Sequence, residues 1–224
     1  MTRLITAWSY SRWSLWDRCP AAFKYKNIDK LPEPQNDAAK AGDLLHRSVE
    51  QYIVQPPNGS IPVPLPFETH FGDLVRAIRA LPRKMAEMQL TYRRNWTATG
   101  WMAKDAWWRN KLDVFAVTSD ETAEVVDWKG GKKHPEHEEQ LETYGLAALL
   151  WKRTIETVKT RMIYVDSGEE TIYDFTRSDI DGLKAKWETR ADALLAATEF
   201  PPRPNHLCGW CHFRASNGGP CRFG

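Results

Sequence analysis

The sequence predicts a single α/β domain spanning residues 1–224, in which helices cover a central sheet. Helical and alternating hydrophobic patterns follow one another in the order helix, three strands, helix, strand, with no internal repeat. The 224 residues are enough for one substantial hydrophobic core. The composition, 42% hydrophobic and 27% charged, is typical of a globular protein.

The chain carries no signal for a membrane or for secretion. No apolar run approaches the roughly 20 residues that a membrane-spanning helix needs. The N-terminal segment also lacks the continuous apolar stretch of a secretory signal. We therefore expect no membrane contact and a location in the reducing cytoplasm.

The first third of the chain is expected to form helices joined by a loop. Residues 11–25 carry apolar side chains at near-helical spacing, interrupted at Pro20, and residues 37–53 have a continuous apolar stripe. The Pro-rich segment 54–67 is expected to be a loop. The helical period returns in residues 71–81 and ends at the next proline.

Strand patterns rich in β-branched and aromatic residues occur in five segments: 86–96, 105–117, 121–129, 157–166 and 169–176. We expect the first three to pair as consecutive antiparallel strands. A helix is expected over residues 134–154, because Pro135 suits its first turn and acidic side chains suit its positive end. A last helix begins near Ser178 and precedes an irregular tail.

A basic stretch from Leu74 to Leu112 contains nine Lys or Arg residues against two acidic ones, with five aromatic residues among them. Basic groups interleaved with aromatic rings suit contacts with phosphates and bases. By itself the pattern favours a solvated helix face followed by strands whose tryptophans belong to the core. The candidate DNA contacts in this stretch are Arg93, Arg94, Arg109 and Lys111.

Asp127 and Lys129 lie two residues apart in a strand pattern, so their side chains project to one face while Trp128 points away. Asp113 lies among apolar residues of the preceding strand, where a carboxylate is costly unless it meets a cation. If these strands pair, Asp113 approaches Asp127, and a divalent cation such as Mg²⁺ relieves their repulsion. By itself, the triplet is more typical of a surface ion pair.

Asp113 followed by "DWK" at residues 127–129, in this order of strands, resembles the PD-(D/E)XK nucleases. Two further patterns narrow the resemblance to their RecB-like branch: G-x-x-x-H in "AGDLLH", ending at His46, and Q-x-x-x-Y in "QLETY", ending at Tyr144. The resemblance implies a restriction-endonuclease-like core with a mixed central sheet. One detail departs from the family, because relatives usually have a Gly just before this Asp and the chain has none there.

The resemblance also implies roles for these residues. His46, Asp113 and Asp127, helped by the carbonyl of Trp128, would hold Mg²⁺ or Mn²⁺. Lys129 would activate water for phosphodiester hydrolysis and stabilise charge on the phosphate. Outside this context, His46 would more often be a core histidine.

Gln140 and Tyr144 lie four residues apart, hence on one face of the same predicted helix. The amide suits a hydrogen bond with the backbone or an active-site group, and the aromatic ring suits contact with DNA. Without the resemblance, Tyr144 would be interpreted as a core residue.

Three of the four cysteines, Cys208, Cys211 and Cys221, lie in the tail, whereas Cys19 lies near the other end of the chain. In a reducing compartment this spacing argues for a metal site rather than for disulfides. A structural Zn²⁺ and an iron–sulfur cluster both fit four thiolates. The spacing alone slightly favours zinc.

The N-terminal segment "SRWSLWDRCPAAFKY" is similar to the signature of the iron–sulfur branch of RecB-like nucleases, which includes AddB and the CRISPR-associated exonucleases. The resemblance therefore implies a 4Fe-4S cluster held by all four cysteines, with residues 1–30 and 200–224 forming one cluster subdomain. The nine residues between Cys211 and Cys221 are a longer gap than is typical of that branch.

These features together predict a metal-dependent DNA exonuclease acting at DNA ends or on single strands. The alternatives are a non-catalytic iron–sulfur module that binds DNA and a structure-specific endonuclease of the same fold. Relatives of this kind act in recombination, repair and CRISPR adaptation. The resemblance therefore implies a strand-annealing recombinase or a CRISPR integrase as partner.

Overall fold

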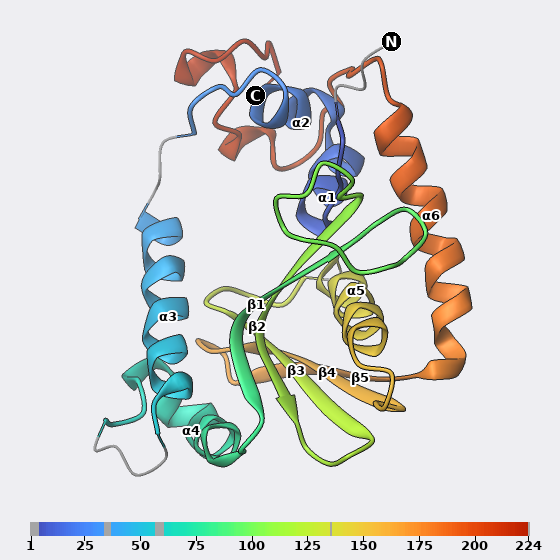
Figure 1. The fold of residues 1–224 in the computed structure, drawn as a ribbon. Coiled ribbons are helices and arrows are strands. Elements are labelled where there is room, and N and C mark those ends of the chain that lie inside the picture. Colours follow the sequence, from blue (N-terminus) through green and yellow to red (C-terminus); the bar gives the residue numbers. More distant parts are fainter. Residues whose placement is uncertain (1–4, 34–36, 57–60, 135, 224) are drawn as a thin grey trace.

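The computed structural model describes residues 5–33, 37–56, 61–134 and 136–223. The chain forms a five-stranded mixed sheet with helices on both faces, which confirms the predicted α/β class (Figure 1). Pro135, expected in the first turn of a helix, lies outside the described residues.

The strands lie side by side in their order along the chain. β1, β2 and β3 pair antiparallel, as predicted, whereas β3 and β4 are parallel. A parallel pair needs a long crossover, and α5 (Glu136–Trp151) supplies it. β5 closes the sheet antiparallel to β4. The strand bounds are β1 Lys84–Tyr92, β2 Trp108–Val117, β3 Thr122–Lys129, β4 Thr157–Tyr164 and β5 Glu169–Thr176.

Helices form a layer on each face of the sheet (Figure 1). One layer contains α5, α6 (Ile180–Ala196) and α1 (Tyr10–Arg18). The other contains α3 (Asp37–Val54) and α4 (Leu65–Ala80). α2 (Pro20–Asn27) lies beside the C-terminal tail. Short 3-10 turns occupy Arg177–Asp179, Cys208–Trp210 and Ala215–Asn217.

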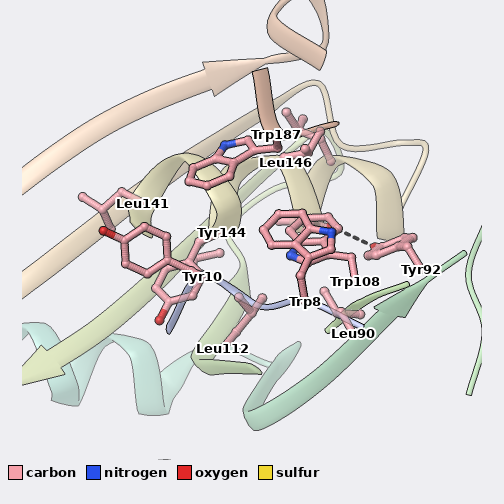
Figure 2. Packing of buried hydrophobic residues seen from close by; sticks show 14 of the residues in the cluster. Trp8, Tyr10, Leu90, Tyr92, Trp108, Leu112, Leu141, Tyr144, Leu146 and Trp187 are labelled. Atoms are coloured by element: carbon pink, nitrogen blue, oxygen red, sulfur yellow. Dashed lines mark hydrogen bonds between the residues drawn. The ribbon is translucent and has the colours of Figure 1, made fainter. Parts of the chain in front are cut away.

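Stacked tryptophans dominate the core between the sheet and the layer of α1, α5 and α6. The ring of Trp8 lies 5.4 Å from that of Trp108 and 5.6 Å from that of Trp187, stacked on both (Figure 2). The hydroxyl of Tyr92 donates to the Ala147 carbonyl at 2.7 Å. Trp107 and Trp108, two tryptophans of the basic stretch, are therefore core residues rather than platforms for DNA bases.

The interruption expected at Pro20 divides residues 11–25 into two helices, because Pro20 starts α2 and holds Cys19 in an extended conformation. Other predicted boundaries differ from the structure. α4 begins at Leu65, inside the segment expected to be a loop, since a proline is tolerated in the first turn of a helix. Residues 93–107 form a loop between β1 and β2 instead of extending both strands.

The two ends of the described chain pack against each other (Figure 1). The rings of Phe23 and Phe200 stack 6.1 Å apart, and those of Tyr25 and Phe213 lie 5.5 Å apart. The Ala21 N–H also donates to the carbonyl of Pro201. Within the described residues, no helix combines the length and the apolar character that crossing a membrane requires.

Candidate active site

The pairing of β2 with β3 ends at Val114 and Val126, and the two strands part at the next residues, Asp113 and Asp127. Both carboxylates therefore lie at the opening between the strands. Asp113 Oδ2 accepts a hydrogen bond of 3.2 Å from the backbone N–H of Trp128. Asp113 is 9% exposed and Asp127 is 1% exposed, so two anions are nearly buried side by side. Such a pair is costly unless a cation compensates it.

A backbone irregularity on β1 brings a third carboxylate to this opening. The ladder between β1 and β2 is interrupted where Glu87 lies opposite Asp113. Glu87 has a φ of 53°, in the left-handed region that is strained for a residue with a Cβ. The sequence has no Gly just before Asp113 on β2, where relatives usually have one. The strained backbone position is instead Glu87, on the neighbouring strand β1.

His46 completes a His-Glu-Asp cluster with these two carboxylates. One ligand atom from each of His46, Glu87 and Asp113 lies within 4.8 Å of the other two. The hydrogen bond from His46 Nδ1 to Asp113 Oδ2, 3.2 Å long, raises the pKa of His46, although burial opposes the charge. α3 presents this histidine to the sheet because Leu45 and Val49 pack in the core beneath it.

Asp127 is held by two neighbours. Its Oδ1 accepts a hydrogen bond of 2.6 Å from the Tyr144 hydroxyl, and its Oδ2 lies 2.6 Å from Lys129 Nζ. No hydrogen bond of normal geometry reaches Oδ2, although this oxygen is buried. Burial raises the pKa of Asp127, while the Lys129 ammonium opposes the rise. The buried Oδ2 thus has the Lys129 ammonium as its cationic neighbour among the described residues.

Lys129 projects to the same face as Asp127, as the alternation of a strand requires. Its side chain is 25% exposed, so the ammonium lies at the border between the core and the solvent. Burial disfavours the ammonium, but attraction to Asp127 and Asp113 outweighs it and raises the pKa of Lys129. A fixed positive charge therefore stands beside the carboxylates.

Gln140 and Tyr144 of the Q-x-x-x-Y pattern form a chain of hydrogen bonds to Asp127. Gln140 Nε2 donates to the Tyr144 hydroxyl, which in turn donates to Asp127. The Gln140 amide was expected to bind either the backbone or an active-site group, and it binds the active-site Tyr144 hydroxyl. The predicted contact of the Tyr144 ring with DNA stays a prediction, although Tyr144 is only 3% exposed and packs in the core of Figure 2.

A groove of about 450 Å³ adjoins this centre. Gln140 and Tyr144 line one side of it, and Arg109 and Lys111 of β2 line another. We refer to this hollow as the basic groove, and its remaining lining residues are Trp8, Ser9, Tyr10, Ser11, Arg12, Trp101, Met102 and Asn110. Lys111 Nζ also contacts Glu87, which links the groove to the His-Glu-Asp cluster.

Arg93 and Arg94, the other predicted DNA contacts, do not line the basic groove. Arg93 Nε donates to Asp105 at 2.6 Å within the loop between β1 and β2. Arg94 binds Asp192 of α6 at 2.7 Å and lies over the ring of Trp107. Both arginines thus stabilise the loop between β1 and β2, through ion pairs with carboxylates and, for Arg94, through contact with the core residue Trp107.

All four cysteines line a second cavity of about 270 Å³ between the two ends of the chain. Cys19 comes from the break between α1 and α2, and the other three come from the tail. Burial raises the pKa of the Cys211 thiol, and the other three cysteines add to this rise. The distance in sequence between Cys19 and Cys208 thus does not prevent the four sulfurs from sharing one cavity.

Glu87 is the candidate site residue that the sequence did not single out. It is one of only two acidic residues in the basic stretch, which is the one signal that could have pointed to it. Its neighbours Ala86 and Met88 suggest an ordinary strand. Its position opposite Asp113 depends on strand register and on a positive φ, and neither is written in the local pattern.

A family model described as the PD-(D/E)XK nuclease superfamily matches residues 7–216. No curated protein is detectably similar in sequence. Among solved structures, a candidate exonuclease from Eubacterium rectale is 11% identical over 93% of this chain and 88% of its own, with a TM-score of 0.50. A crystal structure described as SSO0001 is 15% identical over 99% of this chain and 89% of its own, with a TM-score of 0.46.

Proposed function

Since the chain belongs to the PD-(D/E)XK nuclease superfamily, we propose that it is a metal-dependent DNA exonuclease that hydrolyses phosphodiester bonds at DNA ends. One observation carries this proposal: the His-Glu-Asp cluster, Asp127 and Lys129 meet at the opening between β2 and β3. The likeness to a candidate exonuclease supports action at ends.

The residues present fit a divalent cation. Carboxylate oxygens are preferred by Mg²⁺ and Mn²⁺, and an imidazole favours the transition metal of the two. The buried Asp127 Oδ2, which no hydrogen bond of normal geometry reaches among the described residues, is the kind of oxygen ligand that a cation would satisfy. His46, Glu87, Asp113 and Asp127 would hold the ion, and the Trp128 carbonyl stays a predicted further ligand. When bound, such an ion supplies charge neutralisation at the scissile phosphate and lowers the pKa of water.

The protein's own groups position the reactants. The Lys129 ammonium stands beside Asp127 and can orient a water molecule and stabilise negative charge on the phosphate. The Tyr144 hydroxyl holds the Asp127 carboxylate in one orientation, and Gln140 holds that hydroxyl. Because the Tyr144 hydroxyl is buried, the carboxylate has little freedom to rotate, which preorganises the site.

We further propose that the chain belongs to the iron–sulfur branch of the RecB-like nucleases, with a 4Fe-4S cluster bound by Cys19, Cys208, Cys211 and Cys221. Their shared cavity supports this assignment. A structural Zn²⁺ is the alternative group for the same four thiolates.

Backbone N–H groups already point at two of the sulfurs. The Arg203 N–H donates to Cys19 Sγ at 3.5 Å, and the Asn205 N–H donates to Cys208 Sγ at 3.3 Å. Such bonds stabilise thiolates and are typical of iron–sulfur sites. The cluster would join residues 1–30 to residues 200–224 as one subdomain, with a structural role. A strand-annealing recombinase or a CRISPR integrase remains our proposed partner.

The rival functions are a non-catalytic iron–sulfur module and a structure-specific endonuclease. The complete set of acidic, imidazole and ammonium groups at one opening favours an enzyme over the module. Digestion of end-labelled linear DNA and of closed circular DNA, each with Mg²⁺, Mn²⁺ or chelator, tests all three. We expect linear DNA to be degraded from its ends only with the metal. Cleavage of the circle would favour the endonuclease, and no cleavage at all would favour the module.

A further inference from the structure

Two arginines of the basic groove have no acidic partner. Arg12 Nη1 donates to the Ala7 carbonyl at 2.9 Å, and Arg109 Nε donates to the Trp101 carbonyl at 2.9 Å. Both side chains are half-buried and both line the groove. Within the described part of the chain, no carboxylate lies within 4.0 Å of either guanidinium. Their outward N–H groups therefore face the groove with their charge uncompensated.

Several other arginines of the molecule do bind carboxylates. Arg93 and Arg94 of the same basic stretch each bind a carboxylate, as does Arg190 of α6, which lies 2.7 Å from Glu139. Burial and the neighbouring Arg109 guanidinium together lower the pKa of Arg12. Two like charges held together in a half-buried hollow are stabilised by an anion between them.

The position of the pair defines which anion fits. The groove that holds the arginines is also lined by Tyr144, whose hydroxyl binds Asp127. One side chain therefore separates the groove from the acidic centre where cleavage is proposed. At about 450 Å³, the hollow is large enough for a phosphate group with part of a nucleoside.

We propose that Arg12 and Arg109 form a phosphate subsite, which holds the DNA phosphate adjacent to the scissile bond and so sets the position of cleavage. Guanidinium groups bind phosphate oxygens through paired hydrogen bonds, which gives direction as well as charge. This inference rests on the proposed nuclease function. The bound group is either the terminal phosphate of a DNA end or an internal phosphodiester.

The test measures binding without cleavage. Short single-stranded oligonucleotides with a 5′-phosphate, a 3′-phosphate or hydroxyl ends are titrated in chelator, with fluorescence anisotropy as the signal. The variants are Arg12→Gln, Arg109→Gln and both together. Arg76→Gln is the control, because Arg76 binds Glu68 and Asp73 on the surface of α4. Thermal melting confirms that each variant folds, and Arg12→Lys with Arg109→Lys replaces any that does not.

We expect the double variant to bind at least about 10-fold more weakly, and the control to bind normally. Each lost phosphate contact should also reduce the slope of log affinity against log salt by about 0.7 for a single strand, a change that a purely structural role would not cause. The lysine variants should keep the slope of log affinity against log salt but lose part of the affinity, because a lysine keeps the positive charge without the paired N–H donors of a guanidinium.

The three oligonucleotides identify the source of the phosphate. A loss confined to one phosphorylated end supports a terminal subsite, and an equal loss on all three supports an internal one. Unchanged affinity and slope in folded variants overturn the subsite. If these binding effects appear but the wild-type protein cleaves no DNA with any metal, the nuclease proposal and the role in positioning cleavage fail, and Arg12 and Arg109 stand only as a phosphate-binding pair.

Discussion

The acidic opening and the cysteine cavity are assembled in opposite ways. Asp113 and Asp127 lie at the ends of paired strands, and Tyr144 fixes one of them from a buried helix. The cysteines instead lie in breaks and turns of irregular chain, and all four are partly exposed. The first site has its shape before an ion binds, because the core holds it. The second would gain much of its rigidity from the cluster that we propose it binds.

Removing the ammonium should produce the largest effect. We expect Lys129→Ala to reduce the cleavage rate by about 10²–10³, since one donor to the transition state is lost. Affinity for DNA and for Mn²⁺ should change little, because no ligand is removed. Single-turnover digestion and calorimetry measure the two quantities. A variant that cleaves at nearly the normal rate would contradict the role of Lys129.

The residue found only in the structure provides the next test. Glu87→Gln keeps the size of the side chain but removes an anion from the His-Glu-Asp cluster. We expect affinity for Mn²⁺ to fall by roughly 10-fold, in the range of losses seen when groups around a metal are removed. Glu68→Gln on α4 is the matched control. Equal Mn²⁺ affinity in both variants would show that Glu87 is only the partner of Lys111.

Cys19→Ala should separate the two sites. We expect the purified wild-type protein to be brown with about four iron atoms per chain, and the variant to lose iron and to melt earlier. A domain of this size loses about 2–4 °C in Tm per kcal/mol. Cleavage should fall in proportion to the unfolded fraction, with the acidic opening intact. Full metal content and normal melting would instead indicate a local zinc site without Cys19.

The smallest effect concerns pH. Burial, with help from the Lys129 charge, lowers the pKa of His137 to about 4, while an unfolded histidine titrates near 6.5. The unfolded state therefore takes up this proton first, so the stability contributed by neutral His137 is complete above pH 6.5 and is lost as the pH falls toward 4. Between pH 7 and pH 4.5, the decrease in Tm should be smaller for His137→Gln than for the wild type. Parallel losses would show that His137 does not titrate in this window.

The sequence by itself determined the α/β class, the three antiparallel strands and the shared face of Asp127 and Lys129. These follow from short-range periodicity, because a strand places residues two apart on one face and a helix places residues four apart together. The break between α1 and α2 could also be predicted from the sequence, since Pro20 restricts the backbone of the residue before it, Cys19.

Only the tertiary structure decided which charged groups meet. Glu87 reaches His46 because a strained φ interrupts the β1–β2 ladder, and such an interruption depends on register across strands. In the described part of the chain, the fold also left Arg109 without an acidic partner, whereas Arg94 binds Asp192 on α6. Interactions between exposed charges are largely screened beyond about 10 Å in 0.1 M salt. Which charges interact is therefore set by the chain segments that the core brings together, and not by spacing along the chain.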